Sequence, residues 1–185
     1  MSKTQENLLK AFAGESMALN KYTFYAKQAR KEGFEWIARI FEETSGNERA
    51  HAEEEFENMK DKVTMTNTYD IHEIGSTIEN LKAAAGGEKF ETQSMYPDFN
   101  KVAEEEGENQ AADLFKDIAE VEARHEKRYE NLASDLENGT LYKKDQEIEW
   151  RCLNCGYVHK GTEAPKACPL CKKPQGWYYP IDSVR

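Results

Sequence analysis

Two short stretches, ERAH at residues 48–51 and EARH at residues 122–125, are the strongest indication of the fold in this chain of 185 residues. Each stretch places a glutamate three residues before a histidine, and residues with this spacing share one face of an α-helix. Two helices that present such pairs to a common interior are typical of a di-metal carboxylate site inside a four-helix bundle. The pairs are Glu48 with His51 and Glu122 with His125.

The two motifs belong to an internal repeat, because the offset of 74 residues that relates them also relates other identical residues. A helical hairpin that has been duplicated can bury its apolar face against its own copy. The sequence therefore predicts a mainly α protein built from two similar hairpins. The further matches are Tyr22 with Tyr96, Lys27 with Lys101, Ala29 with Ala103, Glu32 with Glu106, Gly33 with Gly107, Ala38 with Ala112 and Phe41 with Phe115.

Apolar periodicity and helix-end signals predict four helices. Gly33 and Gly107 are suited to end a helix, and Ser76 with Glu79 forms a capping-box pattern. The expected helices cover residues 4–31, 34–61, 76–106 and 109–137, with a loop over 63–75.

The register of the repeat slips once, inside the third helix. Glu15 precedes Tyr22 by seven residues, whereas Glu88 precedes Tyr96 by eight. A π-bulge is the simplest way for a helix to absorb one extra residue, so we expect one between Glu88 and Tyr96. Pro97 lies just after it and is expected to kink the helix without breaking it.

Charge is divided unevenly along the chain, whose formal net charge is −10. Residues 1–150 carry 19 basic and 33 acidic side chains, for a net charge of −14, and residues 151–185 carry six and two, for +4. An acidic body repels phosphate, so we expect no nucleic-acid partner. The chain shows neither a signal-peptide pattern nor an apolar run long enough to cross a membrane, which predicts a soluble, cytoplasmic protein.

Further ligands are expected from the first and third helices. Glu15 lies on the apolar side of the first helix, and Glu88 and Glu91 share a face of the third. Oxygen-rich ligation with one imidazole per metal favours iron or manganese. His72 and His159 have no partner at ligand spacing and are interpreted as surface or structural residues. Neighbouring acids, namely Glu53, Glu54, Glu105 and Glu106, are expected to face solvent.

Four cysteines form two C-x-x-C pairs near the C-terminus, and this spacing predicts one tetrahedral metal site. The spacing does not separate an iron site from a zinc ribbon. We expect residues 140–151 to be a linker and residues 152–185 to be a loop-and-strand module that needs the metal to fold. The cysteines are Cys152, Cys155, Cys168 and Cys171.

With both sites considered together, the whole chain resembles the rubrerythrin family. The motifs that carry the resemblance are Glu15 in AGES, ERAH, Glu88-x-x-Glu91, MYPDF, EARH and the paired cysteines. The resemblance implies a ferritin-like bundle over 1–139 and a rubredoxin-like module over 152–185. It also implies a non-haem di-iron peroxidase that reduces hydrogen peroxide to water in defence against oxidative stress.

Residue roles follow from the same resemblance. Glu48 and Glu122 would bridge two irons. Glu15 with His51 would complete one iron, and Glu88 with His125 the other. Glu91 would exchange with His51 as the redox state changes, and Tyr22 and Tyr96 match family tyrosines near the site. The four cysteines would hold one iron that carries single electrons, with zinc as a possible substitute.

Electron delivery constrains the assembly. His125 lies thirteen residues before Asn138, which is about 20 Å along a helix, so the cysteine site of one chain leaves the bundle far from its own irons. We therefore expect an antiparallel homodimer, with higher or domain-swapped assemblies left open. A rubredoxin or a flavoprotein reductase linked to NADH is the expected donor.

Two alternatives remain open at this stage. One is a ferroxidase that handles or stores iron, as ferritins do, although Glu91 and the cysteine module argue against it. The other is a zinc-ribbon adaptor on a helical scaffold, which would be colourless and free of iron.

Overall fold

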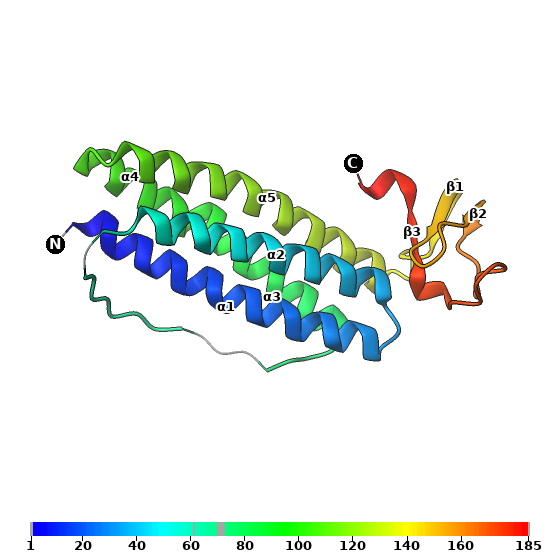
Figure 1. Ribbon diagram of the computed structural model, residues 1–185. Coiled ribbons are helices and arrows are strands. Elements are labelled where there is room, and N and C mark those ends of the chain that lie inside the picture. Colours follow the sequence, from blue (N-terminus) through cyan, green and yellow to red (C-terminus); the bar gives the residue numbers. More distant parts are fainter. Residues whose placement is uncertain (1, 61, 70–72, 185) are drawn as a thin grey trace.

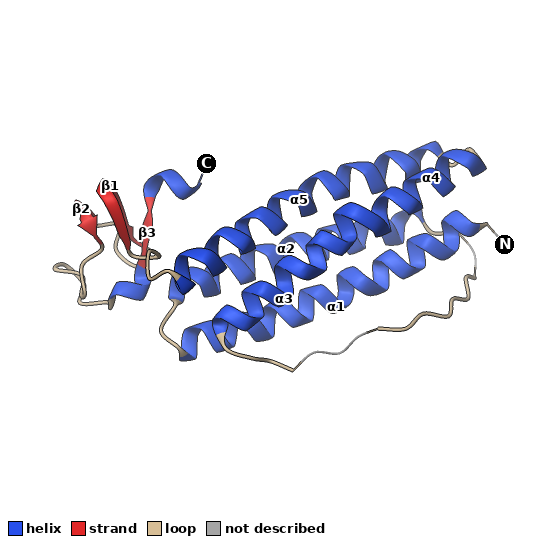
Figure 2. Ribbon diagram, turned by 180° about the vertical axis from the view of Figure 1, so that it is seen from behind, coloured by secondary structure: helices blue, strands red, loops and turns tan. Residues whose placement is uncertain are grey.

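The computed structural model describes residues 2–60, 62–69 and 73–184. Its larger part is a bundle of four long helices. A small sheet module lies beyond one end of the bundle (Figure 1). The helical elements of the bundle are α1 (Lys3–Lys31), α2 (Glu35–Asn58), α3 (Thr77–Phe90), η1 (Glu91–Met95), α4 (Tyr96–Glu106) and α5 (Asn109–Glu137). Figure 2 shows that α3 and α4 continue each other, so they form the third long helix together with η1.

The expected π-bulge is confirmed. Residues Glu91–Met95 form the π-helix η1, between Glu88 and Tyr96. The helix made of α3, η1 and α4 covers 30 residues, whereas its repeat counterpart α1 covers 29. The additional residue is therefore absorbed where the register slips. Pro97 lies in the first turn of α4, where the bulge has already interrupted the regular hydrogen-bond ladder.

Both hairpins turn in the same way. Gly33 and Gly107 adopt positive φ angles of 89° and 73°, a backbone region that glycine enters without steric cost. The backbone amides of Phe34 and Glu108, the residues that follow, donate to Ala29 and Ala103. These two carbonyls are also repeat equivalents, so the duplication seen in the sequence extends to the hydrogen bonds of the turns.

The core is divided into two apolar clusters. One cluster centres on Tyr22, Phe41 and Tyr129, near the turn between α1 and α2. The other centres on Tyr96 and Phe115, near the opposite end of the bundle. Along α1, the third long helix and α5, the expected ligands lie between residues of the first cluster and residues of the second. On α2 they lie between the first cluster and Met59, the residue after the helix, which packs against the second cluster. The apolar packing therefore brackets one polar layer from both ends.

The small module is a three-stranded antiparallel sheet with strand order β2-β1-β3. Its strands are β1 (Lys143–Cys152), β2 (Val158–Glu163) and β3 (Tyr178–Pro180). The segment 140–151, expected as a linker, therefore differs from the expectation, because most of it is the central strand. Trp150 explains the difference: its side chain is fully buried in the module core, and its Nε1 donates to the carbonyl of Gly161 at 3.0 Å.

The module also contacts the end of the bundle. Leu153 and Tyr179 pack against the apolar cluster around Tyr22. Gly176 approaches the turn at Gly33 so closely that a Cβ atom added to it would lie 1.7 Å from the carbonyl oxygen of Gly33. Only a glycine fits there without moving the module. No helix in the described ranges is long and apolar enough to cross a membrane.

Candidate metal sites

The polar layer of the bundle is made of glutamates, one from each long helix. Helix α1 contributes Glu15, α2 contributes Glu48, α3 contributes Glu88 and α5 contributes Glu122. Each side chain is at most 1 % exposed. Burying four carboxyl groups next to each other is costly unless something compensates for their charge. The cluster therefore points to bound cations.

The geometry forms two overlapping groups of ligand atoms, each with its atoms within 4.8 Å of one another. Both groups contain Glu48 and Glu122, so these two carboxylates lie where they can be shared. The structure thus brings together six of the seven ligands expected in the bundle. The groups are Glu15, Glu48, His51 and Glu122, and Glu48, Glu88, Glu122 and His125.

The two histidines face the shared carboxylates through the same ring atom. His51 Nδ1 lies 3.1 Å from Glu48 Oε2 and 2.8 Å from Glu122 Oε1. His125 Nδ1 lies 2.6 Å from Glu122 Oε2 and 3.5 Å from Glu48 Oε1. The i+3 spacing read from the sequence produces this convergence, because it places each histidine one turn from its own glutamate.

In the protein without metal, the two shared carboxylates differ in their pKa values. Burial raises the pKa of Glu48, as do the charges of Glu122 and Glu15, to about 10. Burial also acts on Glu122, but its hydrogen bond with His125 and its close charge contact with His51 outweigh it and lower its pKa to about 2. The histidines therefore neutralise only part of the negative charge of the layer.

The residues present fit a pair of metal ions. Glu48 Oε1 and Glu122 Oε1 are buried and, within the described chain, have no hydrogen bond of acceptable geometry. Two orphaned oxygens on the shared carboxylates are what a bridging role requires, since a cation would satisfy their lone pairs. Carboxylate and imidazole ligands in this proportion suit iron.

Two tyrosines orient the unshared glutamates. The Tyr22 hydroxyl donates to Glu88 Oε1, and the Tyr96 hydroxyl donates to Glu15 Oε1. Both phenols are fully buried, and each tyrosine reaches across to the glutamate of the other hairpin. The repeat-related tyrosines thus fix the carboxylates that belong to one metal position each.

Glu91 lies beside the layer and belongs to neither ligand group. It is the first residue of η1, and its side chain is half-buried. Burial raises its pKa well above the usual range, with contributions from the charges of Glu15, Glu88 and Glu122. Glu91 is therefore close enough to interact with the site while remaining partly open to solvent.

Glu55 is a site residue that the sequence analysis missed. It is fully buried on α2, and its Oε1 lies 3.0 Å from the Tyr96 hydroxyl. Its position, seven residues after Glu48 on the same helical face, was the available signal. The repeat does not indicate a site residue at this position, because the residue equivalent to Glu55 at the offset of 74 is Tyr129. His159 lies on β2 and is partly buried, and His72 lies outside the described residues.

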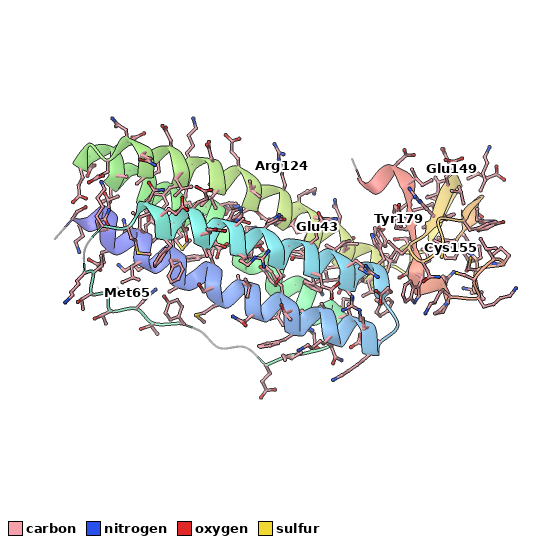
Figure 3. All side chains as sticks on the ribbon, viewed as in Figure 1. Glu43, Met65, Arg124, Glu149, Cys155 and Tyr179 are labelled. Atoms are coloured by element: carbon pink, nitrogen blue, oxygen red, sulfur yellow. The ribbon has the colours of Figure 1, made fainter. Side chains whose placement is uncertain are left out.

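The four cysteines converge in the small module, where Figure 3 marks Cys155. The sulfur of Cys152 lies 3.7 Å from that of Cys171, and the sulfur of Cys155 lies 3.6 Å from that of Cys168. All four are free and form one group within ligand distance. Such a set of thiols fits one tetrahedral metal ion.

The surroundings of the second C-x-x-C pair, Cys168 and Cys171, favour the thiolate form of both cysteines. Burial raises the pKa of Cys168, but the Tyr178 hydroxyl and the backbone amides of Cys171 and Leu170 outweigh it and lower the pKa to about 6. The backbone amide of Lys173 is the main cause that lowers the pKa of Cys171. Metal binding needs deprotonated sulfur, so the lowered pKa values of this pair favour metal binding.

Comparison with known proteins agrees with both sites. The family model described as "Rubrerythrin" matches residues 6–133, and the model "Rubrerythrin, rubredoxin-like domain" matches residues 150–178. The chain belongs to the rubrerythrin family. It is 46 % identical over 181 residues to rubrerythrin from Porphyromonas gingivalis, covering 97 % of this chain and 90 % of that protein. It is also 46 % identical over 183 residues to rubrerythrin-1 from Clostridium acetobutylicum, covering 96 % and 93 %.

Solved structures support the same fold. A structure of nigerythrin in a mixed-valence state aligns with a TM-score of 0.64 at 36 % identity, covering 98 % of this chain and 87 % of that one. A bacterioferritin from Desulfovibrio desulfuricans, described with its di-iron site, aligns with a TM-score of 0.68 at 26 % identity, covering 75 % and 82 %. The expected fold, a ferritin-like bundle with a rubredoxin-like module, is confirmed. As a rubrerythrin-family protein, the chain has a di-iron carboxylate site and a four-cysteine rubredoxin-like site.

Proposed function

We propose that this protein is a non-haem di-iron peroxidase that reduces hydrogen peroxide to two waters in defence against oxidative stress. The observation that carries the proposal is the pair of ligand groups joined by Glu48 and Glu122. Two adjacent positions suit a reaction that needs two electrons at one place. When bound, two ferrous ions would each supply one electron, and two protons complete the conversion of one peroxide into two waters.

The protein side chains would keep the reaction site ordered and dry. Glu15 and Glu88 are buried and fixed by tyrosine hydroxyls, so neither carboxylate can swing freely. The apolar clusters on either side exclude water along the bundle axis. A closed environment of this kind strengthens electrostatic interactions and limits side reactions.

Access is proposed along the side of Glu91 and His51. Both are only partly buried, whereas the four glutamates of the layer are not exposed. The π-helix places Glu91 at this edge, so its carboxylate could enter or leave the ligand set. We propose that Glu91 and His51 alternate at one metal position, with Tyr22 and Tyr96 orienting the ligands that stay in place.

Electrons would arrive through the four-cysteine site. In Figure 1 the module lies at the end of the bundle, whereas Glu48 lies near the middle of α2. We therefore propose an antiparallel homodimer in which the module of one subunit lies beside the di-iron site of the other. The basic module and the acidic bundle have opposite charge, which favours this contact. The donor would be a rubredoxin or an NADH-dependent flavoprotein reductase.

The decisive experiment is an anaerobic titration with hydrogen peroxide. The iron-loaded chain is reduced fully, and peroxide is added in small steps while the visible absorption of the cysteine iron is followed. One peroxide should be consumed for every two electrons, and the colour of the oxidised cysteine iron should return. A protein that reoxidises with dioxygen but leaves peroxide untouched contradicts the proposal.

The dimer can be tested by mixing two inactive variants. One chain carries Cys155→Ser and the other carries Glu122→Gln. If the module of one subunit serves the other, the mixed dimer contains one complete pair of sites and regains part of the turnover. Absence of any recovery, with mixed dimers shown to form, argues against the proposed arrangement.

A ferroxidase is the second candidate, favoured by the likeness to a bacterioferritin. It would oxidise ferrous iron with dioxygen and retain the ferric product. Exposure of the protein to excess ferrous iron in air distinguishes the two. A ferroxidase accumulates many irons in a large shell, whereas the proposed peroxidase keeps the iron of its own two sites.

A further inference from the structure

Helix α2 carries a buried carboxyl group that none of the roles described above uses. Glu55 lies one turn beyond His51, and its side chain is 0 % exposed. A carboxyl group at such a position destabilises a fold unless hydrogen bonds compensate for its burial. Only one of its oxygens has a partner: Oε2 is buried without a hydrogen bond in the part of the chain that the structure describes.

The one hydrogen bond that Glu55 makes among the described residues connects it to the metal site. Its Oε1 lies 3.0 Å from the Tyr96 hydroxyl, and the same hydroxyl contacts Oε1 of Glu15. Glu15 belongs to the ligand group that contains His51. The phenol of Tyr96 therefore lies between a metal-binding carboxylate from α1 and a second carboxyl group from α2.

The number of available hydrogens sets the direction of donation between Glu55, Tyr96 and Glu15. A phenol has one hydrogen to donate, so it can serve only one of two ionised carboxylates. Both contacts become hydrogen bonds when Glu55 carries a hydrogen and donates to the Tyr96 oxygen, which then donates to Glu15. Glu15 is the partner that accepts, because it belongs to the ligand group and a carboxylate must be deprotonated to hold a metal ion.

The other half of the site has no such carboxyl group. By the repeat offset of 74 residues, Glu55 corresponds to Tyr129. The ring of Tyr129 packs against Tyr22 with their centroids 5.5 Å apart, while its hydroxyl has no hydrogen-bond partner among the described residues. Tyr22, which donates to Glu88, thus packs against an aromatic ring, whereas Tyr96 forms a hydrogen bond with a carboxyl group.

We propose that Glu55 is a positioning residue of the di-iron site, which holds Tyr96 so that the Tyr96 hydroxyl orients the Glu15 carboxylate. It makes the metal position of Glu15 and His51 different from that of Glu88 and His125, although both arose from one repeat. The inference depends on the di-iron site alone. Its test by metal binding is independent of whether peroxide is the substrate.

The test uses the full chain and ferrous iron under anaerobic conditions. Glu55→Met removes the hydrogen bond but keeps a flexible side chain of similar length, and Glu55→Gln keeps a donor for Tyr96. Glu54→Gln, an exposed acid on the same helix, is the matched control. Glu55→Met should weaken one of the two bundle irons about 10-fold, as is typical when a group that orients a ligand is lost. Glu55→Gln should weaken it less, and the control not at all.

Mössbauer spectra of the all-ferrous proteins give the second readout. In Glu55→Met the signal of one bundle iron should change, while the other bundle iron and the cysteine iron should not. A change in both bundle irons, or in neither, overturns the proposal. The melting temperature of the metal-free variant should not fall, because an apolar group replaces a buried carboxyl group. If Glu55→Met does not fold, Glu55→Leu takes its place.

A double-mutant cycle tests whether Glu55 acts through Tyr96. Tyr96→Phe removes the hydroxyl that joins the two carboxyl groups. In that background, Glu55→Met should have no further effect on iron affinity or on the spectra. Additive effects of the two substitutions contradict a positioning role and indicate that Glu55 affects the site by another route.

Discussion

Glu32 and Glu106 are repeat equivalents, and each carboxylate binds the start of the helix that opens the other hairpin. Glu32 Oε2 accepts the amide of Thr77, the first residue of α3, at 3.0 Å. Glu106 accepts the amides of Lys3 and Thr4, the first residues of α1, both at 2.9 Å. Amides in the first turn of a helix have no partner within the helix, so a carboxylate there satisfies them and interacts favourably with the helix dipole. Each copy of the repeat thus stabilises the first helix of the other copy. Glu106 is exposed, as expected, but it also has this structural role.

Removal of the Glu106 carboxylate should destabilise the bundle in a manner that depends on pH. Hydrogen bonds from Ser2, Thr4 and Lys3 lower the pKa of Glu106 to about 2 from an ordinary value of 4.5. Its contribution is therefore fully present above pH 4.5 and is lost as the pH falls toward 2. Urea unfolding should show Glu106→Gln less stable than the wild type at neutral pH, with the difference shrinking below pH 4.5. Glu105→Gln, an exposed neighbour, should show no such trend.

Deletion of Gln93, an exposed residue of η1, should turn the π-helix into a regular α-helix. The third long helix would then have the length of α1, and Glu88 would precede Tyr96 by seven residues. Glu91 would take the place that Ala18 has in the first hairpin, facing the apolar cluster. We expect iron to be retained and peroxide turnover to fall strongly. A variant with unchanged turnover would show that the bulge is not needed for the role of Glu91.

Substitution of a shared carboxylate should empty both bundle positions together. Glu122 belongs to both ligand groups and interacts with both histidines. Glu122→Gln is similar in size but has only one oxygen and no charge. Metal analysis should find that the variant retains the iron of the cysteine site and loses the di-iron pair. Retention of one bundle iron at full affinity would show that the two positions do not depend on Glu122 equally.

Loss of one cysteine should separate electron supply from the peroxide reaction. Cys155→Ser leaves the bundle unchanged but removes one sulfur from the tetrahedral set. The visible colour of the cysteine iron should disappear, and the amides of β1 and β2 should exchange faster, since the module has only a small core. The chemically reduced di-iron site should still consume one peroxide, whereas steady turnover with the physiological donor should be lost.

A single methyl group should move the module away from the bundle. Because an added Cβ at Gly176 would lie 1.7 Å from the Gly33 carbonyl oxygen, Gly176→Ala cannot keep the present contact. Small-angle X-ray scattering should show a more extended chain, with the iron of the cysteine site retained. Gly86→Ala is the matched control, because its Cβ would meet nothing within 4 Å. That control should stabilise the helix by up to about 1 kcal/mol.

Much of this protein follows from local patterns and from the repeat. The pairs Glu48–His51 and Glu122–His125 could be recognised because i+3 spacing on a helix forces two side chains to one face. The π-bulge followed from one extra residue between Glu88 and Tyr96. The spacing of Glu55 from Glu48 indicates a shared helical face, but its role depends on Tyr96, 41 residues later, which makes its only hydrogen bond within the described ranges. The central strand β1 was also not predicted, because a strand rich in charged residues resembles a linker in composition.

Spacing along the chain was enough to predict the helices, the duplicated hairpins, the two kinds of metal ligand and the family. The folded structure was needed to show which carboxylates belong to both ligand groups, that Tyr22 and Tyr96 cross to the opposite hairpin, and that Glu55 differs from its counterpart Tyr129. These features depend on the packing of four helices against one another. Side-chain contacts between distant segments are set by that packing and leave no periodic trace in the order of residues.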